Sequence, residues 1–272
     1  MATKPLISKV YSTPDNKKTI YRQYDSRWGS LYYPDKNHTL ASSGCGCLSI
    51  THCALENVAY SNITPKDVRK FMVQYAEAGK GTLQDGIIQG LKKYGYSDCG
   101  IYKIKNNNDI TSFWNALKKG KKGVLLFRGV KKDATNITPD GTVWTEKGHY
   151  VAVLGFKIVG NKHYLYTKDS GRGHDGWWCY ETSMKNSLHK AFLADPPEDK
   201  IILPKRGYFK IGDEGKEVKL LQMVLNAAGY NCGTVDGIYG EKTSNAVTEF
   251  EKDSHITMDG LWGSECQAAF YK

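Results

Sequence analysis

Hydrophobic positions in the first half of the chain recur at helical spacing, three or four residues apart. The run that begins at Cys45 carries such a stripe and predicts a helix over about residues 45–60. Thr64 and Pro65 form a typical helix start, an N-cap followed by proline at the first helical position. Three further amphipathic segments therefore predict helices that pack into a core, at about residues 64–76, 82–94 and 109–119.

The spacing then changes to that of strands. Short apolar runs bounded by glycines and turns predict strands at residues 123–128, 148–156 and 163–169. A turn around Gly160 joins the last two as an antiparallel hairpin. Residues 1–20 are interpreted as an irregular arm able to add an edge strand, and residues 183–192 as a short helix. Because helices come first and antiparallel strands follow, the predicted fold class is α+β.

The last part of the chain contains an internal repeat. Residues 235–243 recur as residues 258–266, each copy with an Asp-Gly turn, an aromatic residue, a glycine and then a helix start. Helices are predicted at about residues 214–228, 241–252 and 264–271. Two prolines and several charges in Asp195–Lys200 are typical of a linker. We therefore expect a first domain over residues 1–194, a linker over residues 195–206 and a small all-α three-helix domain over residues 207–272.

Composition limits the class of protein. The chain has 272 residues and a net charge of +10, and residues 1–202 hold 30 basic and 18 acidic side chains. A basic first domain favours an anionic partner, but no nucleic-acid-binding motif is present, so we expect no nucleic-acid partner. No apolar run is long enough to span a membrane, and the first residues lack the apolar region of a secretory signal. Seven cysteines, an odd number without regular spacing, favour reduced thiols over a disulfide framework.

The sequence also carries candidate chemistry, beginning with Cys45. Cysteine hydrolysis needs a thiolate, an imidazole base, a group that orients the imidazole, and donors for the oxyanion. Cys45 lies at the predicted helix start, where the helix dipole favours a thiolate and lowers the thiol pKa. Gly44 and Gly46 beside it are expected to let the backbone and the sulfur approach a substrate closely.

The remaining parts of such a site are found along the chain. His149 opens a predicted strand directly after a glycine, and Asp169 ends the next strand of the same hairpin. Antiparallel pairing places the start of one strand beside the end of the other, so we expect these side chains to lie together. Gln23 offers a side-chain amide donor, and the backbone N–H of Cys45 offers another. The candidate catalytic residues are therefore Cys45, His149, Asp169 and Gln23.

Other interpretations of these residues remain open. Each could be ordinary: a buried cysteine, a core histidine, a turn aspartate or a surface glutamine. Cys47 is a second candidate thiol, but it lies on the apolar stripe of the helix, which favours Cys45 as the nucleophile. Cys45, Cys47, His52 and Cys53 lie close together in sequence, yet their spacing is not that of a zinc site. We expect neither a metal nor a cofactor.

Taken in order, the motifs resemble the bacteriocin-processing, double-glycine branch of the papain-like cysteine peptidases. Gln23 comes before Asp25-Ser26-Arg27-Trp28, Cys45 lies within Gly44-Cys45-Gly46-Cys47-Leu48-Ser49, and Gly148-His149-Tyr150-Val151 leads to Asp169. The resemblance covers about residues 15–190. It implies a papain-like domain with Cys45 as nucleophile, His149 as base, Asp169 as orienting residue and Gln23 in the oxyanion hole. Cys47 departs from the pattern, since the family commonly has proline or another small residue there.

Residues 207–272 resemble the three-helix peptidoglycan-binding module of wall hydrolases, through Gly212–Val218, Leu221-Gln222 and the two Asp-Gly turns. Together the two resemblances imply a peptidoglycan hydrolase, a phage endolysin, that cleaves a stem-peptide amide as an amidase or an endopeptidase. The implied partner is a Gram-positive-type cell wall, without membrane insertion. Such a protein is made in the host cytoplasm without a signal peptide and reaches the wall after release. Two alternatives are a peptidase that matures leader peptides and a non-catalytic wall-binding protein.

Overall fold

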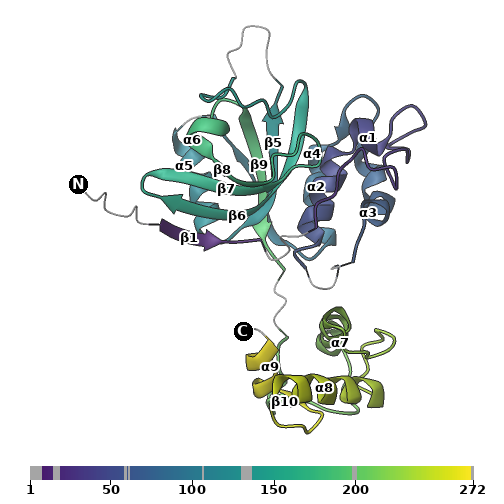
Figure 1. Cartoon of the computed structure of the whole chain (residues 1–272). Helices are drawn as coiled ribbons and strands as arrows, with labels where there is room; N and C mark the ends of the chain where they lie inside the picture. Colours follow the sequence, from purple (N-terminus) through teal and green to yellow (C-terminus); the bar gives the residue numbers. More distant parts are fainter. Residues whose placement is uncertain are drawn as a thin grey trace. The chain divides into compact units, whose positions relative to one another are not determined.

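The chain divides into two compact units, residues 1–197 and 198–272 (Figure 1). The computed structural model describes residues 8–14, 19–57, 60, 62–105, 107–129, 137–197 and 201–270. Parts of the predicted N-terminal arm and of the predicted linker lie outside these residues, as do Val58, Ala59 and Tyr271 at the ends of two predicted helices. Within the described ranges, no helix is long and apolar enough to cross a lipid bilayer.

In the first half of the first unit, one helix packs on a face of the sheet and other helices pack around it. The central helix is α2, Cys45–Ala54, in which every residue after Cys45 is buried. It is preceded by α1, Leu40–Ser43, and flanked by α3, Pro65–Met72, and α4, Gln84–Lys93. A capping box between Thr64 and Asp67 fixes the start of α3, as the sequence predicts. The helix that begins at Cys45 is shorter than expected and ends at Ala54.

The sheet is antiparallel throughout, with the order β4-β9-β5-β6-β7-β8 and with β1 added alongside β6, in the part of the chain that is described. The strands are β1 Ser8–Ser12, β4 Ser97–Lys103, β5 Lys122–Arg128, β6 Gly148–Val159, β7 Lys162–Lys168, β8 Gly176–Cys179 and β9 Leu188–Asp195. The α+β prediction, the three predicted strands and the edge strand from the N-terminal arm are confirmed.

Both faces of the sheet are covered, so its central strands are buried on two sides. Val124 and Phe192 pack with Leu48 and Ile50 of α2 on one face. Their neighbours in sequence point the other way and pack with α5, Asn107–Lys118, in a second core. Figure 1 shows α2 and α3 on one side of the sheet and α5 with α6, Tyr180–Ser183, on the other.

One predicted helix, over residues 183–192, is wrong. The chain forms the short helix α6 and then the strand β9, which lies between β4 and β5. Ala191, Phe192, Leu193 and Ala194 are completely buried, alternately in the two cores. A strand covered on both faces is apolar at every position, so it loses the alternation by which a strand is recognised. Strands β4 and β8 were not expected either.

Short two-stranded ladders complete the description. In the first unit, the 3-10 helix η2, Val73–Tyr75, leads into β2, Ala76–Glu77, which pairs with β3, Gly81–Thr82. In the second unit, β10, Tyr208–Phe209, pairs with β11, Trp262–Gly263. The second pairing holds residues that are far apart in the sequence side by side.

The second unit contains the helices α7 Lys216–Ala228, α8 Glu241–Ser254 and α9 Ser264–Phe270, close to the predicted ranges. The two repeats have the same internal structure. Gln222 of α7 accepts the N–H of Gly237 at 2.8 Å, and Glu251 of α8 accepts the N–H of Gly260 at 2.9 Å. Each Asp-Gly turn is therefore held by a side chain from the helix before it.

Candidate active site

Cys45 is the first residue of α2, with Gly44 as its N-cap. The thiol is half-buried and lines a cleft of about 220 Å³ in the first unit. Burial alone would raise the pKa of Cys45, but the hydrogen bond and the charge of His149 outweigh it and lower that pKa. The helix start adds its positive end to the same effect, since unpaired N–H groups point toward the sulfur side of the helix.

His149, the second residue of β6, lines the same cleft as Cys45. Its Nε2 is 2.6 Å from Oδ1 of Asp169, which leaves Nδ1 as the ring nitrogen available to the thiol. Burial disfavours the charged imidazole, but Asp169 and Cys45 together raise the pKa of His149 to about 10. The imidazole is therefore held charged beside a thiol whose pKa is lowered, which is the arrangement of a thiolate–imidazolium pair.

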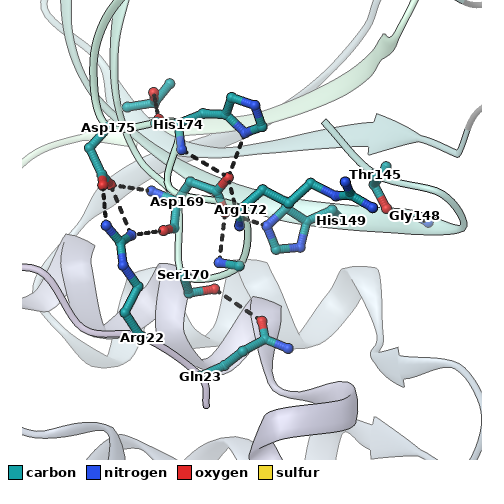
Figure 2. Close-up of polar contacts among 12 residues, drawn as sticks. Arg22, Gln23, Thr145, Gly148, His149, Asp169, Ser170, Arg172, His174 and Asp175 are labelled. Atoms are coloured by element: carbon teal, nitrogen blue, oxygen red, sulfur yellow. Dashed lines mark hydrogen bonds and ion pairs between the residues drawn. The ribbon is translucent and has the colours of Figure 1, made fainter. Parts of the chain in front are cut away.

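Asp169 comes directly after β7 and is completely buried. Besides His149, Oδ1 accepts the N–H of Gly171 at 2.8 Å. Oδ2 accepts the side-chain Nδ1 of His174 at 2.8 Å and the backbone N–H groups of Arg172 and His174 at 3.2 and 3.3 Å. Burial opposes ionisation, yet the hydrogen bonds from His149 and His174 hold the pKa of Asp169 well below its usual range. The carboxylate is thus ionised and fixed in orientation (Figure 2).

Gln23 is docked on the loop that carries Asp169. Its backbone N–H donates to the carbonyl of Ser170 at 3.0 Å, and its side-chain Oε1 accepts the hydroxyl of Ser170 at 3.2 Å. Its Nε2 donates one hydrogen to the carbonyl of Ala41 at 2.6 Å. An amide nitrogen carries two hydrogens, so one remains for the cleft, which Gln23 lines together with Cys45 and His149.

The structure also contains supporting residues that the sequence did not indicate. Arg22 forms an ion pair with Asp175 at 2.5 Å and donates to the backbone carbonyl of Asp169. Asp175 in turn accepts the backbone N–H of Asp169 at 2.9 Å. Both polar groups of the Asp169 backbone are therefore held by this ion pair (Figure 2). The only signal available in the sequence is the position of Arg22 beside Gln23, and that of His174 and Asp175 in the glycine- and aromatic-rich loop.

The second candidate thiol has different surroundings. Cys47 is completely buried, and burial raises the pKa of its thiol. His52 and Cys53 are also completely buried in the first core. Among the residues that the structure describes, no three His, Cys, Asp or Glu side chains are grouped so that they could hold a metal ion.

The two glycines beside Cys45 lie in close contact with other parts of the protein. A Cβ atom on Gly44 would lie 2.5 Å from the carbonyl oxygen of Leu40, and one on Gly46 would lie 2.5 Å from the side chain of Thr82. Both glycines are therefore required by contacts inside the protein.

Part of the second unit matches a known protein family. Residues 214–270 match a family model described as "Putative peptidoglycan binding domain". Residues 214–270 form a peptidoglycan-binding domain. The match includes both Asp-Gly turns and the three helices that surround them, so the peptidoglycan-binding domain accounts for most of the second unit.

A solved structure, a periplasmic domain of the EpsAB fusion protein of the Vibrio vulnificus type II secretion system, is 13% identical over 85% of this chain and 82% of that chain. Its TM-score is 0.25, and a likeness at that level carries no conclusion about fold or function.

Proposed function

We propose that the first unit is a papain-like cysteine peptidase domain and that the whole chain is a peptidoglycan hydrolase of the phage endolysin kind. The observation that carries this proposal is that Cys45 and His149 line one cleft, where Nε2 of His149 lies 2.6 Å from a buried carboxylate and His149 lowers the pKa of the Cys45 thiol. Such a set is suited to nucleophilic attack on an amide. The peptidoglycan-binding domain on the same chain supports the cell wall as the substrate.

The first half of the proposed reaction forms a thioester. The Cys45 thiolate attacks the carbonyl carbon of the amide, while His149 holds the proton taken from the thiol. The second amide hydrogen of Gln23 and the backbone N–H of Cys45 donate to the oxyanion. The Cys45 N–H suits this role, because the first N–H groups of a helix have no acceptor within the helix.

The second half restores the enzyme. His149 donates its proton to the leaving amine, and the C–N bond breaks. A water molecule then gives a proton to His149 and attacks the thioester, which releases the carboxylic acid and returns the proton to the Cys45–His149 pair. Asp169 holds the imidazole with Nε2 protonated and Nδ1 toward the sulfur throughout.

The proposed substrate is an amide of the peptidoglycan stem peptide. Cleavage between muramic acid and L-alanine and cleavage within the peptide need the same residues, so both remain within the proposal. A peptidase for leader peptides has no use for a peptidoglycan-binding domain. The Cys45–His149–Asp169 geometry likewise favours a catalyst over a protein that only binds walls.

Zymography on purified cell walls tests the proposal. The wild-type chain and the Cys47→Ser variant should clear the walls, whereas Cys45→Ala should not clear them but should still pellet with them. Full clearing by Cys45→Ala would exclude the thiol mechanism. Mass spectrometry of the released fragments then identifies the new amino terminus, and thus the bond that is cut.

A further inference from the structure

We propose that His174 is a positioning residue that acts on His149 through Asp169. The inference rests on the proposed hydrolytic function. Asp169 is shared by two imidazoles: Oδ1 lies 2.6 Å from Nε2 of His149, and Oδ2 lies 2.8 Å from Nδ1 of His174. Figure 2 shows the two rings on different sides of the carboxylate.

The contact from His174 is the shortest that Oδ2 receives. The backbone N–H groups of Arg172 and His174 reach the same oxygen at 3.2 and 3.3 Å, at the upper end of the usual range and just beyond it. The side chain of His174 therefore does most to stop the carboxylate from rotating about its bond to Cβ. Fixing Oδ2 keeps Oδ1 aimed at His149.

The ring of His174 is itself held in place. Its side chain is 15% exposed, and its ring packs against Trp144, with centroids 4.5 Å apart, and edge-on against Trp178 at 5.2 Å. Its backbone carbonyl accepts the hydroxyl of Thr167 at 2.5 Å. Because the tryptophans hold the ring, its Nδ1 donor keeps the Asp169 carboxylate in place, and the carboxylate in turn keeps His149 in place.

Two roles for His174 can be separated, because the residue both donates a hydrogen bond and fills space between tryptophans. His174→Asn keeps a donor nitrogen on Cγ, as Nδ1 is, but loses the ring. His174→Phe keeps an aromatic ring against Trp144 and Trp178 but loses the donor. The proposal assigns the effect on catalysis to the donor.

The first experiment measures release of new amino termini from purified walls by the full chain at a range of wall concentrations. We expect His174→Phe to lower the apparent kcat about 10-fold with KM unchanged, less than the ~100-fold that a misplacement of 1 Å can cause. We expect His174→Asn to stay within about threefold of the wild type. The reverse order, with activity kept by Phe and lost by Asn, or a wild-type kcat for His174→Phe, would overturn the proposal.

His163 offers a matched control in the same unit. Its Nδ1 contacts a carboxylate oxygen of Glu181 at 2.6 Å, and its ring stacks on Trp114 with centroids 4.2 Å apart, but it does not contact Asp169. His163→Phe and His163→Asn should leave the apparent kcat unchanged. A loss in these variants as large as in His174→Phe would show that the effect is a general one on packing, and would also overturn the proposal.

A second readout does not depend on hydrolysis. The rate at which iodoacetamide alkylates Cys45 at pH 6, located by peptide mapping, reports how well His149 keeps the thiol ionised. His174→Phe should slow this rate about five- to tenfold, and His174→Asn should restore it. If the wild-type chain hydrolyses no wall but the variants still differ in alkylation, the proposed function fails and the role of His174 stands. If His174→Phe is alkylated like the wild type, the role of His174 fails.

Discussion

Cys45 and Cys47 lie two residues apart on the same helix, yet their thiols differ in acidity. Burial raises the pKa of both, but only Cys45 has His149 as a partner, and that contact lowers its pKa below the usual value. A thiol without such a partner stays protonated when it is buried. The difference depends on where each side chain points from α2. Residues two apart on a helix do not face the same side, so the two thiols cannot both lie in the cleft.

The Cys45–His149 pair predicts the pH dependence of wall hydrolysis. In the proposed hydrolase, the active form has Cys45 ionised and His149 protonated. It exists above the lowered thiol pKa and is lost as pH rises through the His149 pKa of about 10. Ordinary thiols ionise near pH 8.5. Initial rates on purified walls should therefore already be high at pH values well below 8.5 and should fall toward pH 10. Rates that rise through pH 8.5 to a plateau at pH 10 would contradict the pairing, provided that circular dichroism shows an unchanged fold.

At the scale of elements, the sequence predicts those segments in which hydrophobic residues recur at a single spacing, that of a helix or that of a strand. Helices α3 and α4 each bury one stripe in the core around α2, and strand β7 follows a tight turn, so each shows its own period. Strand β9 does not, because both of its faces are buried from Ala191 to Ala194, and the helix predicted over residues 183–192 overlaps the start of this strand. Strand β4 is mostly exposed or half-buried and pairs at the sheet edge, so its sequence carries little hydrophobic signal.

The residues of the candidate site likewise divide into those that the sequence indicates and those that it does not. Cys45 and His149 come from the starts of a predicted helix and a predicted strand, and the hairpin brings Asp169 to His149. These residues could be found because regular elements place them. His174 and Asp175 reach Asp169 from an irregular loop, where no period relates position in sequence to position in space. Their contacts are visible only in the structure.

A buried ion pair joins the helices of the first unit to its sheet. Lys122, the first residue of β5, lies 2.7 Å from Glu56, two residues after α2, and both side chains are almost fully buried. Lys122→Met leaves the Glu56 carboxylate without this partner and should lower the free energy of unfolding by about 3–5 kcal/mol. The double variant with Glu56→Leu and Lys122→Met should lose less of the free energy of unfolding than the single variant. Guanidinium unfolding followed by tryptophan fluorescence measures both, and a double variant less stable than the single one would contradict the argument.

In the peptidoglycan-binding domain, the two repeats predict a pH-dependent contact in α8. Gln222 accepts the N–H of Gly237 and also donates its amide to Asp236 at 2.9 Å. Glu251 accepts the N–H of Gly260 in the second repeat, beside Asp259, but a carboxylate has no hydrogen to donate. Burial, and after it the neighbouring Asp259 charge, raises the pKa of Glu251, so the protonated acid resembles the glutamine of the first repeat.

The sign of the stability change follows from that raised pKa. The contribution of Glu251 is fully present below its unfolded pKa and is lost as pH rises through the higher folded value. The unfolding temperature of the peptidoglycan-binding domain should therefore fall as the pH rises above the unfolded pKa, which is near 4.3. Glu251→Gln should flatten this dependence and raise the stability at pH 8. Calorimetry of the full chain at several pH values tests it, and a Glu251→Gln variant less stable than the wild type at pH 8 would refute it.

At the scale of the whole molecule, the two units differ in charge. Residues 1–197 carry 29 basic and 16 acidic side chains, whereas residues 198–272 carry 9 basic and 12 acidic ones. The peptidoglycan-binding domain therefore has no excess positive charge with which to attract an anionic wall. Its binding should depend on short-range contacts, and the long-range attraction should come from the first unit.

This difference predicts two components of wall binding with different salt dependence. Screening shortens the range of charge interactions from about 10 Å at 0.1 M salt to about 3 Å at 1 M salt. The full chain should pellet with purified Gram-positive walls at both ionic strengths, since the contacts of the peptidoglycan-binding domain persist. A chain that ends at Pro197 should pellet at low salt and remain in solution at high salt. Removing the anionic wall polymers should abolish binding of the shorter chain at low salt as well, while the full chain still pellets. Two results would contradict this assignment: pelleting of the shorter chain at 1 M salt, or complete loss of pelleting by the full chain at 1 M salt. Either would show that the salt-resistant contacts do not come from the peptidoglycan-binding domain.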